Sequence, residues 1–100
     1  MLEVVAEPRR REILRLVWDR ERSAGDIASR MDVTFSAVSQ HLSRLRDAGC
    51  VHVRRDGRQR FYRARRDALG PIATMLEAFW GDRLQRLAKL AEAEEGRKRR

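Results

Sequence analysis

Small polar side chains lie on one side of an amphipathic segment, TFSAVSQHLSRLRDAGC, at residues 34–50. On a helical wheel of about 100° per residue, Val38, Leu42 and Leu45 fall together on one side. The opposite side and its flanks carry hydroxyls, an amide, a carboxylate and a guanidinium, from Ser36, Ser39, Gln40, Ser43, Arg44 and Asp47. A solvated helix face would ordinarily carry Lys and Glu at such positions. Small groups that both donate and accept hydrogen bonds match the edges of DNA bases, with Gln suited to adenine and Arg to guanine.

An arginine-rich segment follows directly. Residues 54–66, RRDGRQRFYRARR, contain seven arginines and one aspartate. Arginines on a protruding hairpin can neutralise phosphates or enter a narrow minor groove. The alternative interpretation is an edge hairpin that is charged to resist strand pairing. Seven arginines exceed what that role needs, so we favour a contact with phosphates.

Local signals place these segments in a helix-turn-helix followed by a hairpin. Pro8 suits the first position of a helix, and Ser23 begins a capping-box-like sequence. Thr34 suits the N-cap of the polar helix, and Gly49 suits its left-handed C-terminal end. Two helices joined by a short turn and followed by a ribbon predict a winged helix-turn-helix, which is mostly α with a two-stranded β-wing (α+β).

The wing is expected over residues 51–64, with Asp56-Gly57 as its turn signal. A two-residue loop would set Val51 opposite Tyr62, and a three-residue loop with a bulge would set Val53 opposite Phe61. Both registers stay open at this point.

A long helix is expected after Gly70-Pro71, with one apolar stripe along it. A domain this small cannot bury the whole stripe, so we expect it to pair with a second copy of the chain. Leu2 and Val5 at the N-terminus are expected to join this interface. The predicted interface residues are Leu2, Val5, Ile72, Leu76, Phe79, Trp80, Leu84 and Leu87. A two-fold dimer predicts an inverted-repeat operator with half-sites about one helical turn apart.

Composition agrees with a polyanionic partner. The 100 residues carry a net charge of +8, which indicates nucleic acid or an acidic membrane surface, although a merely solvated basic surface is the simpler alternative. The basic tail lacks neighbouring apolar anchors, so a membrane is not expected as a partner. We expect one DNA-binding and dimerisation domain over residues 1–93 and a basic, disordered tail over residues 94–100.

Cysteine usage and the N-terminus indicate a cytoplasmic protein. Cys50 is the only cysteine, which excludes an internal disulfide and fits a reducing compartment. We expect it to be a buried filler. The sequence has no signal-peptide pattern and no run of about 18 apolar residues. An enzyme is not expected either, because there is no Gly-rich phosphate loop and no nucleophile beside a base.

Three stretches together resemble the ArsR/SmtB-type transcriptional repressors. They are AEPRRREILRLV, SAGDIASRMDVTFSAVSQHLSRLRDAGCV and RRDGRQRFYR, and the resemblance runs from about residue 2 to residue 90. It implies a homodimeric winged-helix repressor, often autoregulated, that an inducer releases from its operator. It also implies that the second helix of the turn reads the major groove and that the wing grips the flanking backbone. Carried over to this sequence, the DNA-binding roles fall on Thr34, Ser36, Ser39, Gln40, Ser43, Arg44, Arg54, Arg55, Arg58 and Arg60. His41, at the border of the polar helix near its core side, is a further candidate for a phosphate contact, with packing or a hydrogen bond to the backbone as the alternative.

Metal sensing is common in that family, but its ligands are missing here. The helix before the recognition helix reads SAGDIASRM and has no cysteine, and the C-terminal helix has no histidine. The chain therefore resembles a branch without metal sites, such as the sporulation delay protein regulator, and we expect no metal and no cofactor. A small-molecule inducer is compatible with the resemblance but is not identified by it. The second function considered is a winged-helix module for protein interaction or double-stranded RNA.

Overall fold

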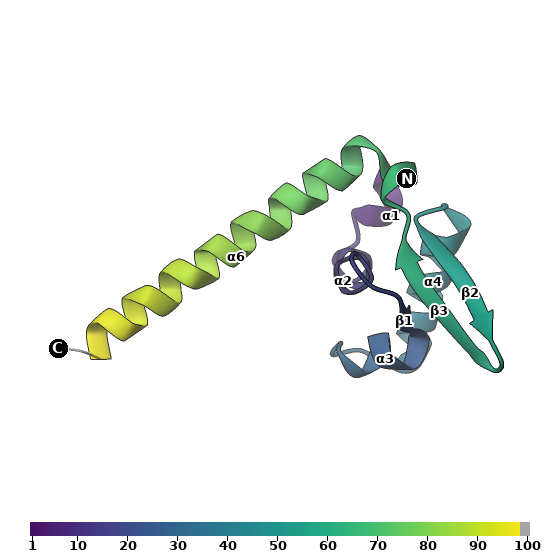
Figure 1. The fold of residues 1–100 in the computed structure, drawn as a ribbon, viewed down its shortest axis with the longest axis horizontal. Coiled ribbons are helices and arrows are strands. Elements are labelled where there is room, and N and C mark those ends of the chain that lie inside the picture. The colour runs from purple at the N-terminus through teal and green to yellow at the C-terminus, as the bar shows by residue number, and fades with distance from the viewer. Residues whose placement is uncertain (99–100) are drawn as a thin grey trace. The chain divides into compact units, whose positions relative to one another are not determined.

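The computed structural model describes the backbone of residues 1–98 and the side chains of residues 1–82 and 86–93. The chain forms two compact units, residues 1–70 and the helix from Pro71 onward, and each is described by itself. The elements in order are α1 Leu2–Val5, α2 Pro8–Leu16, β1 Arg22–Ser23, α3 Ala24–Ser29, α4 Phe35–Asp47, β2 Val51–Asp56, β3 Gln59–Ala64, α5 Arg66–Leu69 and α6 Pro71–Lys98 (Figure 1).

The core of the first unit lies between α2, α3 and α4. Ile13 and Leu14 of α2, Ile27 of α3 and Leu42 and Leu45 of α4 are at most 1% exposed. Val38 is also fully buried, so the apolar side predicted for residues 35–48 is confirmed. Burying each such side chain contributes on the order of 1.5–3 kcal/mol, which fixes the rotation of α4 about its axis.

Capping residues set the ends of α3 and α4 as predicted. The Ser23 and Thr34 hydroxyl oxygens accept hydrogen bonds from the Asp26 and Ala37 amides, both at 3.1 Å. At the other end of α4, Gly49 adopts φ +76°. The Cys50 amide there donates to the Leu45 carbonyl at 2.9 Å. This positive-φ ending directs the chain from α4 straight into β2.

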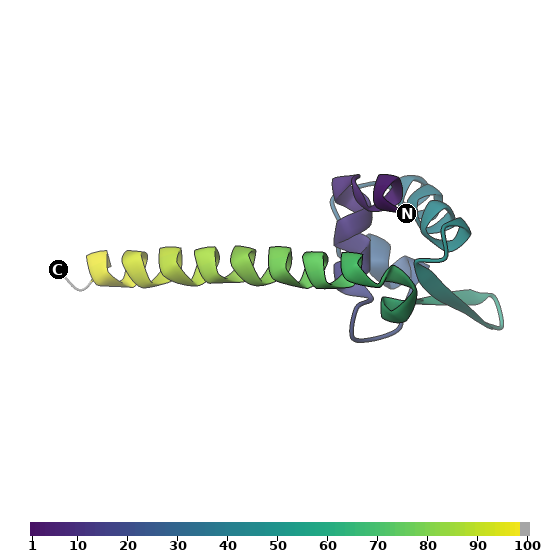
Figure 2. The same ribbon diagram turned by 90° about the horizontal axis from the view of Figure 1, so that it is seen from above.

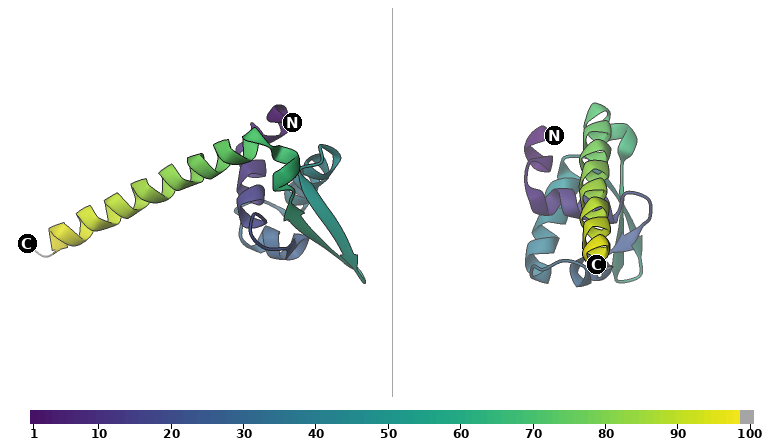
Figure 3. Two further views of the ribbon diagram at one scale, coloured as in Figure 1. Left: turned by 45° about the horizontal axis from the view of Figure 1, so that its top comes forward. Right: turned by 90° about the vertical axis from the view of Figure 1, so that its left-hand side faces the viewer.

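The sheet has three strands where two were predicted. β1 pairs antiparallel with β3, so the order is β1-β3-β2. A two-residue strand is too short to leave an alternating pattern in the sequence, which explains why it was missed. The fold is therefore mostly helical with a small antiparallel sheet, and the two-stranded description was incomplete. The β2–β3 hairpin extends away from the helices of the first unit (Figure 3, left).

Both hairpin registers considered from the sequence are wrong. The observed pairs include Val51 with Ala64 and Val53 with Tyr62, around a two-residue loop of Gly57 and Arg58. Gly57 has φ +63°, and no non-glycine residue of the described chain has positive φ. A two-residue turn centred on Asp56-Gly57 would have required a positive φ at the aspartate. In the observed turn glycine takes the first central position, so no other residue of the turn needs a positive φ.

The second unit is one continuous helix, α6 (Figure 2). Met75, Phe79, Leu87 and Leu90 are 49–67% exposed on it. At about 100° per residue these four side chains fall within one arc of roughly 120°. α6 begins at Pro71, as predicted from Gly70-Pro71, and its backbone is helical through Lys98. The disordered tail over residues 94–100 stays a prediction, and its last two residues lie outside the described part of the chain.

Candidate nucleic-acid interface

The polar face of α4 is open to solvent. Ser36, Ser39, Gln40 and Arg44 are exposed, and Ser43 is half-buried. These side chains lie opposite the buried apolar side of the same helix, so the packing that fixes α4 also aims them outward. Thr34, the N-cap, is exposed at the start of this face. Every hydroxyl and amide predicted to contact bases is thus accessible.

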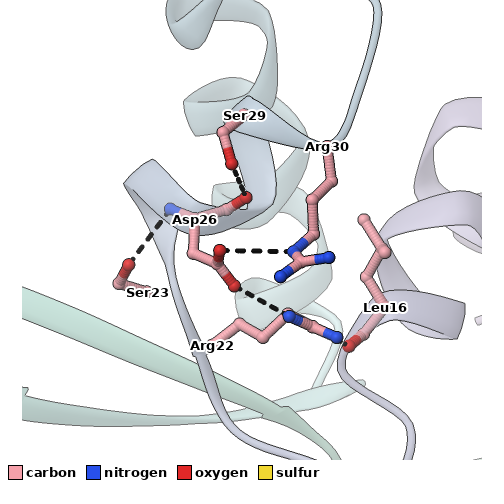
Figure 4. A network of polar contacts seen from close by, with 6 residues as sticks. All are labelled: Leu16, Arg22, Ser23, Asp26, Ser29 and Arg30. Atoms are coloured by element: carbon pink, nitrogen blue, oxygen red, sulfur yellow. Dashed lines mark hydrogen bonds and ion pairs between the residues drawn. The ribbon is translucent and has the colours of Figure 1, made fainter.

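The preceding helix, α3, is held in place by a polar network around Asp26 (Figure 4). The Asp26 carboxylate accepts from Arg22 at 2.9 Å and from Arg30 at 3.2 Å. Arg22 also donates to the Leu16 carbonyl at 2.7 Å, which ties α3 to the end of α2. The two guanidinium groups, Arg22 foremost, lower the pKa of Asp26. The network fixes the first helix of the helix-turn-helix, against which α4 packs.

The wing carries two kinds of arginine. Arg54 donates to both oxygens of Glu21, at distances down to 2.7 Å, and its guanidinium lies 4.6 Å from the centre of the Phe61 ring. This contact lowers the pKa of the Glu21 carboxyl group. The resulting carboxylate balances the positive charge of Arg54 within the fold. Arg54 is therefore exposed but already partnered, unlike the free phosphate contact expected of it.

Arg55, Arg58 and Arg60 form the second kind. They are exposed, and no ion pair joins them to a carboxylate among the described side chains. Arg55 and Arg60 are direct cross-strand partners, on the face of the hairpin that carries Val53 and Tyr62 nearer its base. Like charges placed opposite each other are unfavourable until an anion lies between them. The tip of the wing therefore carries positive charge that no carboxylate among the described side chains balances.

A hollow of about 380 Å³ joins the wing to the helix-turn-helix. It brings together three of the predicted residues, Ser39, Arg58 and Arg60, which are separated by up to 21 positions in sequence. Its full lining comes from the end of β1, the start of α3, the exposed face of α4, the hairpin loop and strand β3. It consists of Ser23, Ala24, Gly25, Phe35, Ser39, Arg58, Gln59, Arg60 and Tyr62.

His41 is the predicted DNA contact that the structure places elsewhere. Its Nδ1 accepts from Arg10 Nε at 3.3 Å, and its Nε2 lies 3.7 Å from the Glu7 carboxylate. The ring is half-buried and faces the start of α2. His41 therefore ties α4 to α2 rather than lying on the exposed polar face.

The structure adds residues that sequence reasoning did not single out. Phe35, the first residue of α4, is 57% exposed beside Ser39, and Gln59 lines the same hollow. Arg63 is a further exposed arginine on the wing. Gln59 and Arg63 belong to the arginine-rich segment, so the segment's composition was a usable signal for them. Phe35 gave none, because an aromatic residue next to an apolar stripe is ordinarily assigned to the core.

The predicted interface residues divide by exposure. Leu2, Phe79 and Leu87 are exposed and Ile72 is half-buried, whereas Val5, Leu76 and Trp80 are buried. Leu84 lies outside the described side chains.

Cys50 is fully buried, as predicted, and this burial raises the pKa of its thiol.

The described residues form neither a metal-binding cluster nor a membrane-spanning helix. No cluster of three His, Cys, Asp or Glu side chains suited to a metal ion occurs in residues 1–82 and 86–93. In the part of the chain that the structure describes, no helix is both long and apolar enough to cross a membrane.

Comparison with other proteins gives a consistent result. Residues 7–53 match the family described as "Bacterial regulatory protein, arsR family". The transcriptional activator HlyU of Vibrio cholerae is 40% identical over 62 residues, which cover 62% of this chain and 57% of HlyU. The biofilm growth-associated repressor of Agrobacterium fabrum is 32% identical over 80 residues, which cover 80% of this chain and 66% of the repressor. The chain thus spans less than two thirds of the length of these curated relatives.

Solved structures extend the similarity to nearly a whole chain. The crystal structure of a possible transcriptional regulator for arsenical resistance is 40% identical, with a TM-score of 0.67. The match covers 88% of this chain and 92% of that one.

Proposed function

Because the chain belongs to the arsR family of bacterial regulatory proteins, we propose that it is a sequence-specific DNA-binding transcriptional regulator. The family and the curated relatives are transcriptional regulators rather than enzymes. In this proposal α4 enters the major groove, and the wing arginines bind the phosphates beside it. Sequence is read by Ser36, Ser39, Gln40, Ser43 and Arg44.

The observation that carries this proposal is the hollow between α4 and the wing. On one side it has a base-reading type of surface, small and polar, and on the other it has arginines without carboxylate partners. A protein-interaction module would not need two guanidinium groups without carboxylate partners, those of Arg58 and Arg60, beside the exposed Ser39. Their charge is matched by the regular phosphates of a duplex.

We further infer that the regulator is a homodimer that binds an inverted-repeat operator. The support is the arc of exposed Met75, Leu87 and Leu90 on α6, since a helix in water rarely leaves three large apolar side chains exposed together. A second copy of the chain can cover this arc, because a two-fold axis places the same apolar arc of the partner against it. Each protomer would then present one α4 to one half-site.

The DNA-binding proposal is tested by selecting binding sequences from a random duplex library. The enriched duplex, a scrambled duplex and a double-stranded RNA are then compared by fluorescence anisotropy at two salt concentrations. We expect an enriched inverted repeat that is bound tightly at near-physiological salt, while the other two are not. Equal binding to all three that disappears with salt would overturn the proposal and favour the interaction or RNA module.

The dimer is tested by its mass in solution. The wild-type chain is expected near twice 11.7 kDa, and Leu87→Glu combined with Leu90→Glu should return it to 11.7 kDa. Glu77→Lys, an exposed position outside the apolar arc, is the matched control and should leave the dimer intact. A wild-type monomer, or a dimer that survives the double substitution, would contradict this interface.

We assign the protein to the repressors and expect an inducer to release it. The relatives include both an activator and a repressor, so a reporter assay is needed to separate the two roles. With the selected operator placed across a promoter, expression of the wild-type protein should lower the reporter signal, and Gln40→Ala should restore it. A wild-type protein that raises the signal would make it an activator. Small molecules that relieve repression in this reporter would be candidate inducers.

A further inference from the structure

Phe35 occupies an unusual place on the recognition helix. It is the first residue of α4, directly after the Thr34 cap, and it is 57% exposed. The apolar side of α4 is already filled by Val38, Leu42 and Leu45, which are at most 1% exposed. The fold of the first unit therefore leaves most of this aromatic ring in solvent.

The surroundings of Phe35 limit what it can contact. It lines the hollow together with Ser39, one turn further along α4, and with Arg58 and Arg60 of the wing. An apolar ring thus shares one hollow with an exposed hydroxyl and with two guanidinium groups that have no carboxylate partner. The ligand that suits this surface is a polyanion that also presents an apolar group, at the level of the bases in the groove of a nucleic acid.

The major groove of DNA contains one such group. Among the base edges exposed there, only thymine carries a methyl group, and aromatic or small apolar side chains are its usual contacts. We propose that Phe35 is a specificity-determining residue that contacts the C5-methyl group of a thymine in each half-site, at the end of the recognition helix nearest the wing. This inference rests on the proposed function, and it identifies one base that the hydrogen-bonding residues of α4 do not account for.

The test removes single methyl groups from the operator. Each thymine of the selected duplex is replaced in turn by deoxyuridine, which lacks only the C5-methyl, and affinities are measured by anisotropy. For the wild-type protein we expect about a fourfold loss at one thymine per half-site, the effect of exposing one buried methyl group. Phe35→Ala should bind thymine and deoxyuridine equally at that position, while Phe35→Leu should keep part of the difference.

Two controls make the result specific. Asp47→Asn, an exposed position on the same helix that has no assigned DNA contact, should retain the full difference between thymine and deoxyuridine. The thermal unfolding of Phe35→Ala should match that of the wild-type protein, because the ring contributes little to the core.

The possible failures are distinguishable. If no sequence is enriched, the proposed function falls and this inference falls with it. If an operator is bound tightly but no thymine is sensitive to its methyl group, or if the sensitivity survives Phe35→Ala, only the role of Phe35 is refuted. An operator whose half-sites lack thymine would refute it as well.

Discussion

Removing a wing arginine should change how DNA affinity depends on salt. Each protein charge that neutralises a phosphate contributes about 0.9 to the slope of log affinity against log salt concentration. Arg58 and Arg60 are exposed on the wing without a carboxylate partner. A dimer presents each of them twice, so Arg58→Ala or Arg60→Ala should reduce the slope by about 1.8.

This change is large enough to measure by anisotropy titration. Between about 50 and 200 mM salt, a slope difference of about 1.8 changes the affinity ratio of variant to wild type by about tenfold. The variants should therefore be much weaker than the wild type at low salt and closer to it at high salt. They should lose affinity for the operator and for scrambled DNA to a similar extent, because phosphates carry no base information.

Arg54→Ala is the matched control within the same hairpin. Arg54 already holds Glu21, with a shortest contact of 2.7 Å, so its removal should change the slope less than removal of Arg58. Arg60→Lys keeps the charge and should keep the slope. An unchanged slope in Arg58→Ala, or a changed base preference, would show that the wing does not act as a phosphate clamp.

Three further predictions concern the recognition helix and its support. Gln40→Ala and Arg44→Ala should each relax the base preference at particular operator positions by about 1–3 kcal/mol, as measured by competition with single-base variants, and uniform weakening would contradict this. Thr34→Ala should lower the free energy of unfolding by about 1 kcal/mol in urea titrations, and Thr34→Ser, which keeps the cap, should lower it much less. Folding lowers the pKa of Asp26 and of Glu21 from their ordinary values of 3.8 and 4.5, so their stabilisation is complete above about pH 4.5 and is lost as the pH falls through the lowered values. Urea unfolding between pH 3 and pH 6 should show this loss, and Asp26→Asn should reduce it.

Features that depend on a few neighbouring residues were predicted from the sequence. The caps at Ser23 and Thr34 and the left-handed ending at Gly49 each involve hydrogen bonds over a short stretch of chain. The apolar side of α4 was predicted for a similar reason, since helical periodicity fixes which side chains share a face. These local features were sufficient to establish the helix-turn-helix and the outward polar face.

Features that depend on distant partners were not predicted. The contact between Arg54 and Glu21 joins residues 33 positions apart, and no local pattern in the sequence indicates it. The partners of His41 within the fold, Arg10 of α2 and Glu7 at the N-cap of α2, are likewise distant in sequence. The hairpin register followed from which residue takes the positive φ of the turn, and the sequence Asp-Gly-Arg permits more than one choice.

The arginines of the first unit differ in whether a carboxylate of the same chain pairs with them. Arg22 and Arg54 each bind a carboxylate and hold two elements together, so their charge is used for folding. Arg55, Arg58 and Arg60 meet none, and Arg55 and Arg60 even lie opposite each other across the hairpin. In the proposed complex, a phosphate that approached these two guanidinium groups would relieve the repulsion between them. Under the proposed function, overall charge alone does not predict the DNA surface: an arginine would contribute to that surface only where the fold leaves its charge unmatched.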